Sequence, residues 1–132
     1  MAKLIHTMIR VKDLDSSLRF YEEAFGLRVK HRLDFPDFSL AYLRNEESSA
    51  ELELTWNKGR PEPYTHGDGY GHVAVSVADA KADRERLIGL GMKPLDLKEF
   101  KAYDGQFIAR FFFILDPDGY KIEVLERHGH YE

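Results

Sequence analysis

Two histidines and two glutamates recur at matching places along the chain. His6 precedes Glu53 by 47 residues, and His72 precedes Glu123 by 51 residues. Imidazole nitrogens and carboxylate oxygens suit several divalent first-row ions, and four such ligands leave two positions of an octahedral shell open. A substrate with two neighbouring oxygens fits those positions. The four residues therefore predict a metal centre, provided that the fold brings them together.

Both glutamates alternate with apolar neighbours, in Leu52-Glu53-Leu54 and in Ile122-Glu123-Val124. This alternation places each carboxylate on the strand face opposite an apolar set. Taken singly, a glutamate in such a pattern more often faces water, and a strand histidine more often makes an ordinary hydrogen bond. The joint placement of two His and two Glu at equivalent positions of a repeat favours metal ligation over these alternatives.

The repeat is visible in the segments that carry the histidines. Residues 6–13 read HTMIRVKD and residues 72–79 read HVAVSVAD, and each segment leads into a helical stretch that closes at a glycine, Gly26 or Gly91. The opening segments are rich in strand formers, and each ends at an Asp suited to start a helix. The chain therefore contains two copies of one unit.

Each unit is expected to contain a strand, a helix and three further strands, so that the fold is α+β with the order βαβββ-βαβββ. Helical spacing of Leu14, Leu18, Tyr21 and Phe25 predicts the first helix, and Ala80, Leu87 and Leu90 are the contact candidates of a more exposed second helix at 80–90. The expected strands are 4–11, 27–34, 38–44 and 50–56, then 71–77, 92–97, 107–115 and 120–126.

We expect one domain over residues 1–132, built of modules at about 1–60 and 68–127, with a tail at 128–132. A turn at Asp116-Pro117-Asp118-Gly119 precedes the last strand. If each sheet curves, its opening and closing strands pair and bring each His beside its Glu. Two such halves supply two imidazoles and two carboxylates to one ion.

Composition excludes several classes of function. The net charge of −4 and the isoelectric point near 5.9 argue against a nucleic-acid surface, and no apolar run reaches the length of a membrane span. The absence of cysteine removes disulfides, thiolate nucleophiles and sulfur ligands together. The first residues lack the pattern of a signal peptide, so a cytoplasmic location is expected.

These residues resemble the vicinal oxygen chelate superfamily (the glyoxalase/bleomycin resistance/dioxygenase-like fold), and within it the short bacterial type of glyoxalase I, or lactoylglutathione lyase. The resemblance spans nearly the whole chain. The Asp-Pro-Asp-Gly turn is common in the superfamily, whereas the order His, Glu, His, Glu is more specific. The matching segments are 4–11, Phe20-Tyr21 with Gly26-Leu27, 53–57, 70–74 and 116–123.

The resemblance implies that His6, Glu53, His72 and Glu123 ligate one metal ion. It also implies a homodimer whose sites lie between chains, with nickel or cobalt favoured and zinc possible. The implied reaction isomerises the hemithioacetal of methylglyoxal and glutathione to S-D-lactoylglutathione through a metal-bound enediolate. Glu123 is the expected base that moves the proton from C1 to C2, with Glu53 as its counterpart; the sequence does not rank the two.

Four residues are candidates for substrate binding. Arg10 and Asn57 match positions that bind the glutathione moiety in the family, and Trp56 stands next to the site in the sequence. Lys101 lies in the segment Lys98–Arg110, which is about two residues longer than the compact loop usual in the short bacterial enzymes. The alternative for Lys101 is an ordinary solvated lysine in a surface loop. For the thiol, a different low-molecular-weight thiol is an alternative to glutathione.

The same fold serves other functions, which remain alternatives. One alternative is another metalloenzyme of the superfamily, namely a thiol transferase, an epimerase or an extradiol dioxygenase. A dioxygenase of the two-His–one-Glu type would leave Glu53 without a role. The other is a metal-free protein that binds an aromatic drug, which has no use for four aligned ligands.

Overall fold

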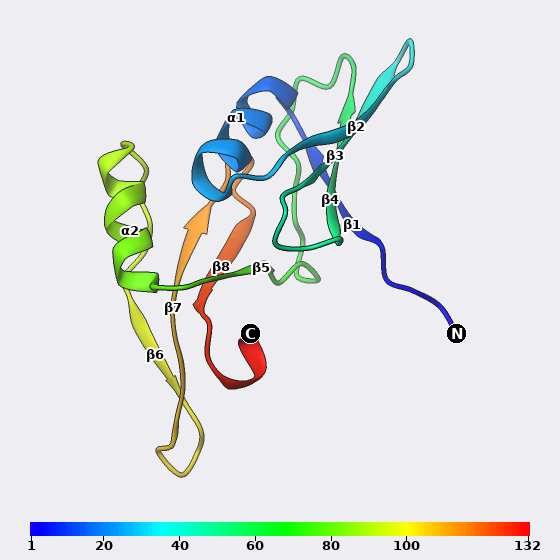
Figure 1. Cartoon of the computed structure of the whole chain (residues 1–132). Coiled ribbons are helices and arrows are strands. Elements are labelled where there is room, and N and C mark those ends of the chain that lie inside the picture. Colours follow the sequence, from blue (N-terminus) through cyan, green and yellow to red (C-terminus); the bar gives the residue numbers. More distant parts are fainter. The chain divides into compact units, whose positions relative to one another are not determined.

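One helix and one four-stranded sheet recur in each half of the chain (Figure 1). The structure, a computed structural model, describes residues 1–132 and divides into the N-terminal unit, Met1–Thr65, and the C-terminal unit, His66–Glu132. The predicted α+β fold of paired βαβββ modules is confirmed.

The N-terminal unit contains β1 (His6–Val11), α1 (Leu14–Phe25), β2 (Arg28–Asp34), β3 (Phe38–Arg44) and β4 (Glu51–Asn57). Its sheet has the order β1-β4-β3-β2, in which β1 and β4 run parallel and the other neighbours antiparallel. The first and last strands of the unit are therefore adjacent. The β2–β3 hairpin projects from the unit in Figure 1.

The C-terminal unit contains β5 (Val73–Val77), α2 (Ala80–Gly89), β6 (Lys98–Lys101), β7 (Phe107–Leu115) and β8 (Lys121–Glu126). Its sheet has the order β5-β8-β7-β6, again with the first and last strands parallel. The predicted pairing of opening and closing strands is thus found in both units. It follows that each histidine strand adjoins the strand that carries its glutamate.

Both helices begin at the predicted aspartates. The Asp13 carboxylate accepts a hydrogen bond from the backbone N–H of Ser16 at 3.0 Å, and Asp79 accepts one from Ala82 at 2.9 Å. These N-caps satisfy backbone donors that have no partner within the helix. Helix α1 ends at Gly26, whose φ of 65° is in the left-handed region that glycine adopts without strain.

The apolar face of α1 is wider than the predicted stripe. Leu14 and Tyr21 are buried as predicted, but Leu18 and Phe25 are only half-buried. The buried face also includes Ser17, Phe20 and Ala24. Small residues serve this face well because Ser17 and Ala24 allow the helix to approach the sheet closely.

Helix α2 is the more exposed helix, as predicted, and buries only Ala80 and Leu87. Leu90 was expected to make contact, but it is 51% exposed. The helix ends at Gly89, so Leu90 lies beyond its last turn and off the face that meets the sheet.

The strand predicted at 92–97 is wrong, since the edge strand β6 lies at Lys98–Lys101 instead. Pro94 explains the difference, because it has no N–H to donate to a ladder and is disfavoured within strands. In this stretch only the Leu95 N–H bonds to the neighbouring strand, at 2.8 Å from the carbonyl oxygen of Phe113. Regular pairing with β7 begins only after Pro94, at Lys98.

The last residues form a short 3₁₀ helix, Gly129–Tyr131. The imidazole Nδ1 of His128 lies 2.7 Å from the carbonyl oxygen of Ile108, which ties the segment to β7. No helix in the chain is long and apolar enough to cross a membrane.

Candidate metal centre

The N-terminal unit brings His6 and Glu53 together. Nε2 of His6 lies 3.2 Å from Oε2 of Glu53, and Glu53 is only 8% exposed. In the β1–β4 register His6 is opposite Glu51, so it reaches the carboxylate diagonally, on the same face two residues along β4. A carboxylate this buried is costly unless it is paired or bound to a cation.

The C-terminal unit repeats this arrangement with His72 and Glu123. Nε2 of His72 lies 2.9 Å from Oε2 of Glu123. Val73 pairs with Ile122, so His72 also reaches a glutamate two residues along the parallel neighbour. The Glu123 side chain is 17% exposed, compared with 10% for Glu53. The two units thus build one pair each in the same way.

Each pair suits half of a metal site. Two ligand atoms bound at right angles, each about 2.1 Å from an ion, lie about 3 Å apart. The two Nε2–Oε2 separations, 3.2 and 2.9 Å, are close to this value. Neither unit gathers three such side chains. Each unit by itself therefore brings together two of the four predicted ligands.

An aromatic ring lies against each histidine. The ring of Tyr42 contacts His6 with centroids 5.5 Å apart and an interplanar angle of 72°, and Phe113 contacts His72 at 5.6 Å and 71°. Tyr42 is the cross-strand partner of Glu53, and Phe113 is the partner of Glu123. The two rings are therefore repeat-equivalent members of the two sites.

Tyr42 adds a polar contact that Phe113 lacks. Burial raises the pKa of the Tyr42 hydroxyl, as do its hydrogen bond to Glu53 and the negative charge of that carboxylate. The sequence patterns point to neither ring as part of a site. Strand register would identify both rings as cross-strand partners of the two glutamates. To predict that register, the turn between β3 and β4 and the turn between β7 and β8 must first be located in the sequence.

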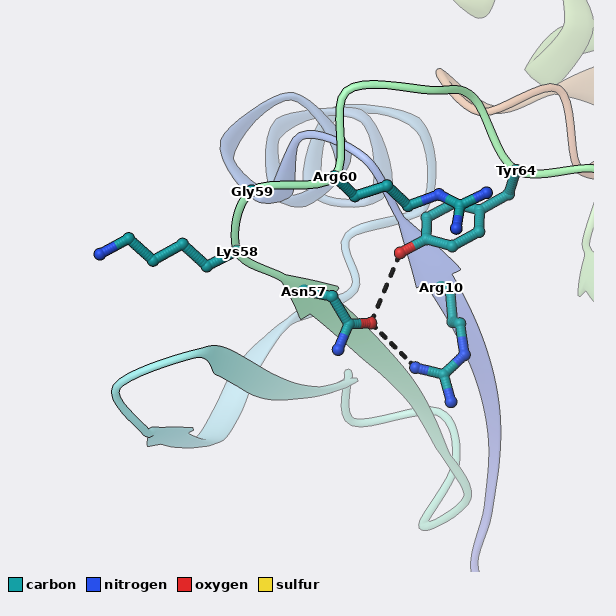
Figure 2. Close-up of a pocket in the computed structure, with 6 residues that line it drawn as sticks. All are labelled: Arg10, Asn57, Lys58, Gly59, Arg60 and Tyr64. Carbon is teal, nitrogen blue, oxygen red and sulfur yellow. Dashed lines mark hydrogen bonds between the residues drawn. The ribbon is translucent and has the colours of Figure 1, made fainter.

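A pocket of about 340 Å³ lies at the far ends of β1 and β4, within the N-terminal unit (Figure 2). The Asn57 side-chain oxygen accepts hydrogen bonds from Nη1 of Arg10 at 2.9 Å and from the Tyr64 hydroxyl at 3.4 Å. The other lining residues are Lys58, Gly59 and Arg60. The two substrate-binding candidates Arg10 and Asn57 are thus in contact.

Arg60 is held in place on the rim of this pocket. Its guanidinium carbon lies 4.0 Å from the centre of the Tyr64 ring, and its nitrogens donate to the carbonyl oxygens of Glu62 and Pro63, each at 3.2 Å. Lys58 points away from the other side chains in Figure 2. With cationic side chains and no acidic one in its lining, the pocket suits an anion such as a carboxylate.

Two of the predicted substrate-binding residues lie elsewhere. Trp56 alternates with Glu53 and Asn57 along β4, so it takes the opposite face, and it does not line the pocket. Lys101 ends β6, is exposed, and pairs with Glu99 at 3.4 Å. It is opposite Phe107, six residues along β7 from the partner of Glu123, so roughly 20 Å separates it from that site.

The predicted turn between β7 and β8 sets the start of the strand that carries Glu123. The buried Asp116 carboxylate accepts hydrogen bonds from the backbone N–H groups of Asp118 and Tyr120, both at 2.9 Å. Gly119 has a φ of 80°, which the turn needs and which other residues rarely adopt. This turn therefore fixes the register of β8.

Comparison with known families agrees with this architecture. The sequence profile of the Glyoxalase/Bleomycin resistance protein/Dioxygenase superfamily matches residues 3–124, so the chain belongs to this superfamily. The glyoxalase I of Leishmania major superposes with a TM-score of 0.75 at 36% identity, covering 96% of this chain and 87% of that chain. The glyoxalase I of Zea mays gives 0.81 at 30% identity, covering 96% and 45%.

Relatives of full length are similar in sequence as well. The lactoylglutathione lyase of Haemophilus influenzae is 39% identical over 128 residues, which cover 94% of this chain and 92% of that enzyme. The lactoylglutathione lyase of Neisseria meningitidis serogroup A is 39% identical over 129 residues, covering 95% and 91%. The predicted resemblance to glyoxalase I, and with it an enzyme of the lactoylglutathione lyase type, is confirmed.

Proposed function

We propose that the chain isomerises the hemithioacetal of methylglyoxal and glutathione to S-D-lactoylglutathione. The observation that carries the proposal is the pair of equivalent His–Glu contacts, on β1 and β4 and at β5 and β8. The names of the bacterial relatives support the same reaction. A drug-binding protein without a metal would have no need of two such contacts built to one plan.

The proposed ligands of one divalent ion are His6, Glu53, His72 and Glu123. Nitrogen and oxygen ligands without sulfur suit nickel or cobalt, and also zinc. The resemblance favours nickel or cobalt and a homodimer in which each chain supplies one pair to a shared site. When bound, the cation supplies stabilisation of the negative charge that develops on two neighbouring substrate oxygens. A cytoplasmic location belongs to the same proposal.

Glu123 is the proposed base. Its carboxylate accepts the proton from C1 of the hemithioacetal, and the electron pair of the broken C–H bond forms a C1–C2 double bond while the C2 carbonyl becomes an oxyanion. Glu123 then donates the proton to C2, and the proton of the C1 hydroxyl passes to the C2 oxyanion, so that C1 becomes the thioester carbonyl and C2 becomes an alcohol. Substrate and product are isomers, so no oxidant or reductant is needed.

The pocket at Arg10 and Asn57 is the proposed site for a carboxylate of the thiol. His6 and Arg10 share one face of β1, as Glu53 and Asn57 share one face of β4, and four residues of strand span about 13 Å. The distance from the proposed metal ligands to the pocket is thus about the length that an extended tripeptide thiol spans. Glutathione carries carboxylates at both ends, and the cationic lining of the pocket supports it as the thiol.

The experiment that tests this function uses metal-stripped protein reloaded with nickel, cobalt or zinc. Formation of the thioester is followed by absorbance with hemithioacetals of glutathione and of other small thiols. Activity that returns with metal, and that is highest with glutathione, is the expected result. No thioester with any of the metals, from protein whose metal content has been measured, would refute the proposal.

A further inference from the structure

In each His–Glu site an aromatic ring meets the histidine in nearly the same geometry, but only the ring of the first site carries a hydroxyl. The ring centroid distances to histidine differ by 0.1 Å and the interplanar angles by 1°, since the values are 5.5 Å and 72° at Tyr42 and 5.6 Å and 71° at Phe113. Each ring stands across the strand from its glutamate. The Tyr42 hydroxyl is therefore a polar group beside Glu53 that the ring facing Glu123 lacks.

The Tyr42 hydroxyl acts on the carboxylate of Glu53. Side chains directly opposite each other on antiparallel strands have Cβ atoms about 5 Å apart, so a tyrosine hydroxyl reaches a facing carboxylate. Tyr42 donates a hydrogen bond to Glu53, while Nε2 of His6 contacts the same carboxylate. Glu53 thus has one neighbour on each side, and its rotation is restricted.

The second site has no such donor at the equivalent position. A phenylalanine ring offers only carbon and hydrogen to Glu123, whose side chain is also the more exposed of the two, at 17% against 10%. Hydrogen bonds from outer groups orient a ligating carboxylate. Among these equivalent contacts, Glu53 is therefore held by two side chains, His6 and Tyr42, whereas Glu123 is held by His72.

We propose that Tyr42 is a positioning residue that holds Glu53 in the orientation of a metal ligand, a restraint that Phe113 does not give to Glu123. The inference rests on the proposed function, because it takes both glutamates as ligands. It distinguishes two glutamates whose sequence patterns are alike.

The test exchanges the two rings in both directions. Tyr42→Phe removes the hydroxyl from the first site, and Phe113→Tyr introduces one at the second. Metal affinity is measured by competition between each variant and a chromophoric chelator for nickel, and kcat and KM are measured at saturating nickel. Tyr103→Phe is the matched control, since Tyr103 is fully exposed in the β6–β7 loop.

Opposite results are expected from the two exchanges. Tyr42→Phe weakens nickel binding by about tenfold, the low end for loss of an outer-shell hydrogen bond, and changes kcat less than it changes the affinity. Phe113→Tyr lowers kcat by about tenfold or more at unchanged KM, with nickel binding retained, because the new hydroxyl restrains the base. The control leaves nickel affinity at the wild-type value.

A double-mutant cycle separates this role from a general effect on folding. Tyr42→Phe is combined with Glu53→Gln and, separately, with Glu123→Gln, and nickel affinity is measured for each. The effect of Tyr42→Phe disappears beside Glu53→Gln and persists beside Glu123→Gln. An equal effect in both backgrounds, unchanged affinity in Tyr42→Phe, or unchanged kcat in Phe113→Tyr would overturn the inference.

The affinity cycle does not depend on turnover. If wild-type protein binds nickel but isomerises no hemithioacetal, the proposed function fails while the cycle still decides the role of Tyr42. If wild-type protein is active and the cycle shows no coupling between Tyr42 and Glu53, the positioning role fails and the proposed function stands.

Discussion

Removing one arm of the thiol is a direct test of the Arg10–Asn57 pocket. Two dipeptide thiols divide glutathione between them: γ-glutamylcysteine keeps the γ-glutamyl arm, and cysteinylglycine keeps the glycyl arm. We expect the γ-glutamyl arm to be the one that reaches the pocket. The hemithioacetal of γ-glutamylcysteine should therefore be a good substrate and that of cysteinylglycine a poor one.

The lengths of the two arms lead to this expectation. With standard bond lengths, the cysteine sulfur is about 10 Å from the γ-glutamyl carboxylate and about 8 Å from the glycyl carboxylate when each arm is extended. The bonds from the sulfur to a metal-bound oxygen add about 4 Å. The γ-glutamyl arm therefore spans the separation of about 13 Å along the strands with a little length to spare. The glycyl arm falls slightly short of it.

The energetic cost follows from the contact that is lost. A hydrogen bond to a charged group contributes about 1.5–3 kcal/mol, and the pocket is open to water, so the lower value applies. Loss of about 1.5 kcal/mol corresponds to about a tenfold fall in kcat/KM. Most of the fall should be in KM, because the carboxylate lies far from the reacting carbons and is bound equally before and during the reaction.

The assay measures thioester formation with each thiol at a known concentration of hemithioacetal. Arg10→Gln supplies the matched variant. It should lose about tenfold with γ-glutamylcysteine and little with cysteinylglycine, because the glycyl carboxylate of the second thiol does not reach Arg10. Equal kcat/KM for the two thiols in wild-type protein, or equal losses on Arg10→Gln, would refute the reasoning.

Three further outcomes are expected. Glu123→Gln should lower kcat by about 10²- to 10⁴-fold, the usual worth of a general base, in protein whose circular dichroism and sedimentation match those of the wild type; retained activity would contradict its role. Asp116→Ala should lower the free energy of unfolding by about 2 kcal/mol in urea, because two backbone donors lose their acceptor, and an unchanged midpoint would argue against the turn. Hydrogen bonds from Ser39 and Arg32 hold the pKa of the Asp34 carboxyl below its ordinary value. The contribution of Asp34 to stability is therefore present above the ordinary pKa and is lost as the pH falls through the lowered pKa. Ser39→Ala should raise this pKa in a carbon-detected NMR titration, and an unchanged pKa would show that Ser39 does not cause the shift.

The order of elements and the His–Glu pairs could be predicted because both depend on local signals. Aspartate caps, a closing glycine and alternation around Glu53 and Glu123 act within a few residues of sequence. The repeat then implies that the first and last strands of each unit pair. Contact of His6 with Glu53 follows from that pairing alone.

Features that depend on register or on a single proline could not be predicted in this way. Pro94 delays the edge strand to Lys98–Lys101. Tyr42 and Phe113 become neighbours of the two histidines only after two turns of different length fix the register of β3 and β7. Trp56 is adjacent to Asn57 in sequence, but one step along a strand turns its side chain to the other face.

Each His–Glu contact joins the first strand of its unit to the last, across 47 residues in one unit and 51 in the other. An unfolded chain does not hold these donors together, so an ion that bridges them binds the folded protein alone and resists its opening. Metal scarcity then acts on the lifetime of the protein as well as on its catalysis. A cell that withholds the ion would leave a chain more readily degraded by proteases, so that the amount of this enzyme would follow the supply of its metal.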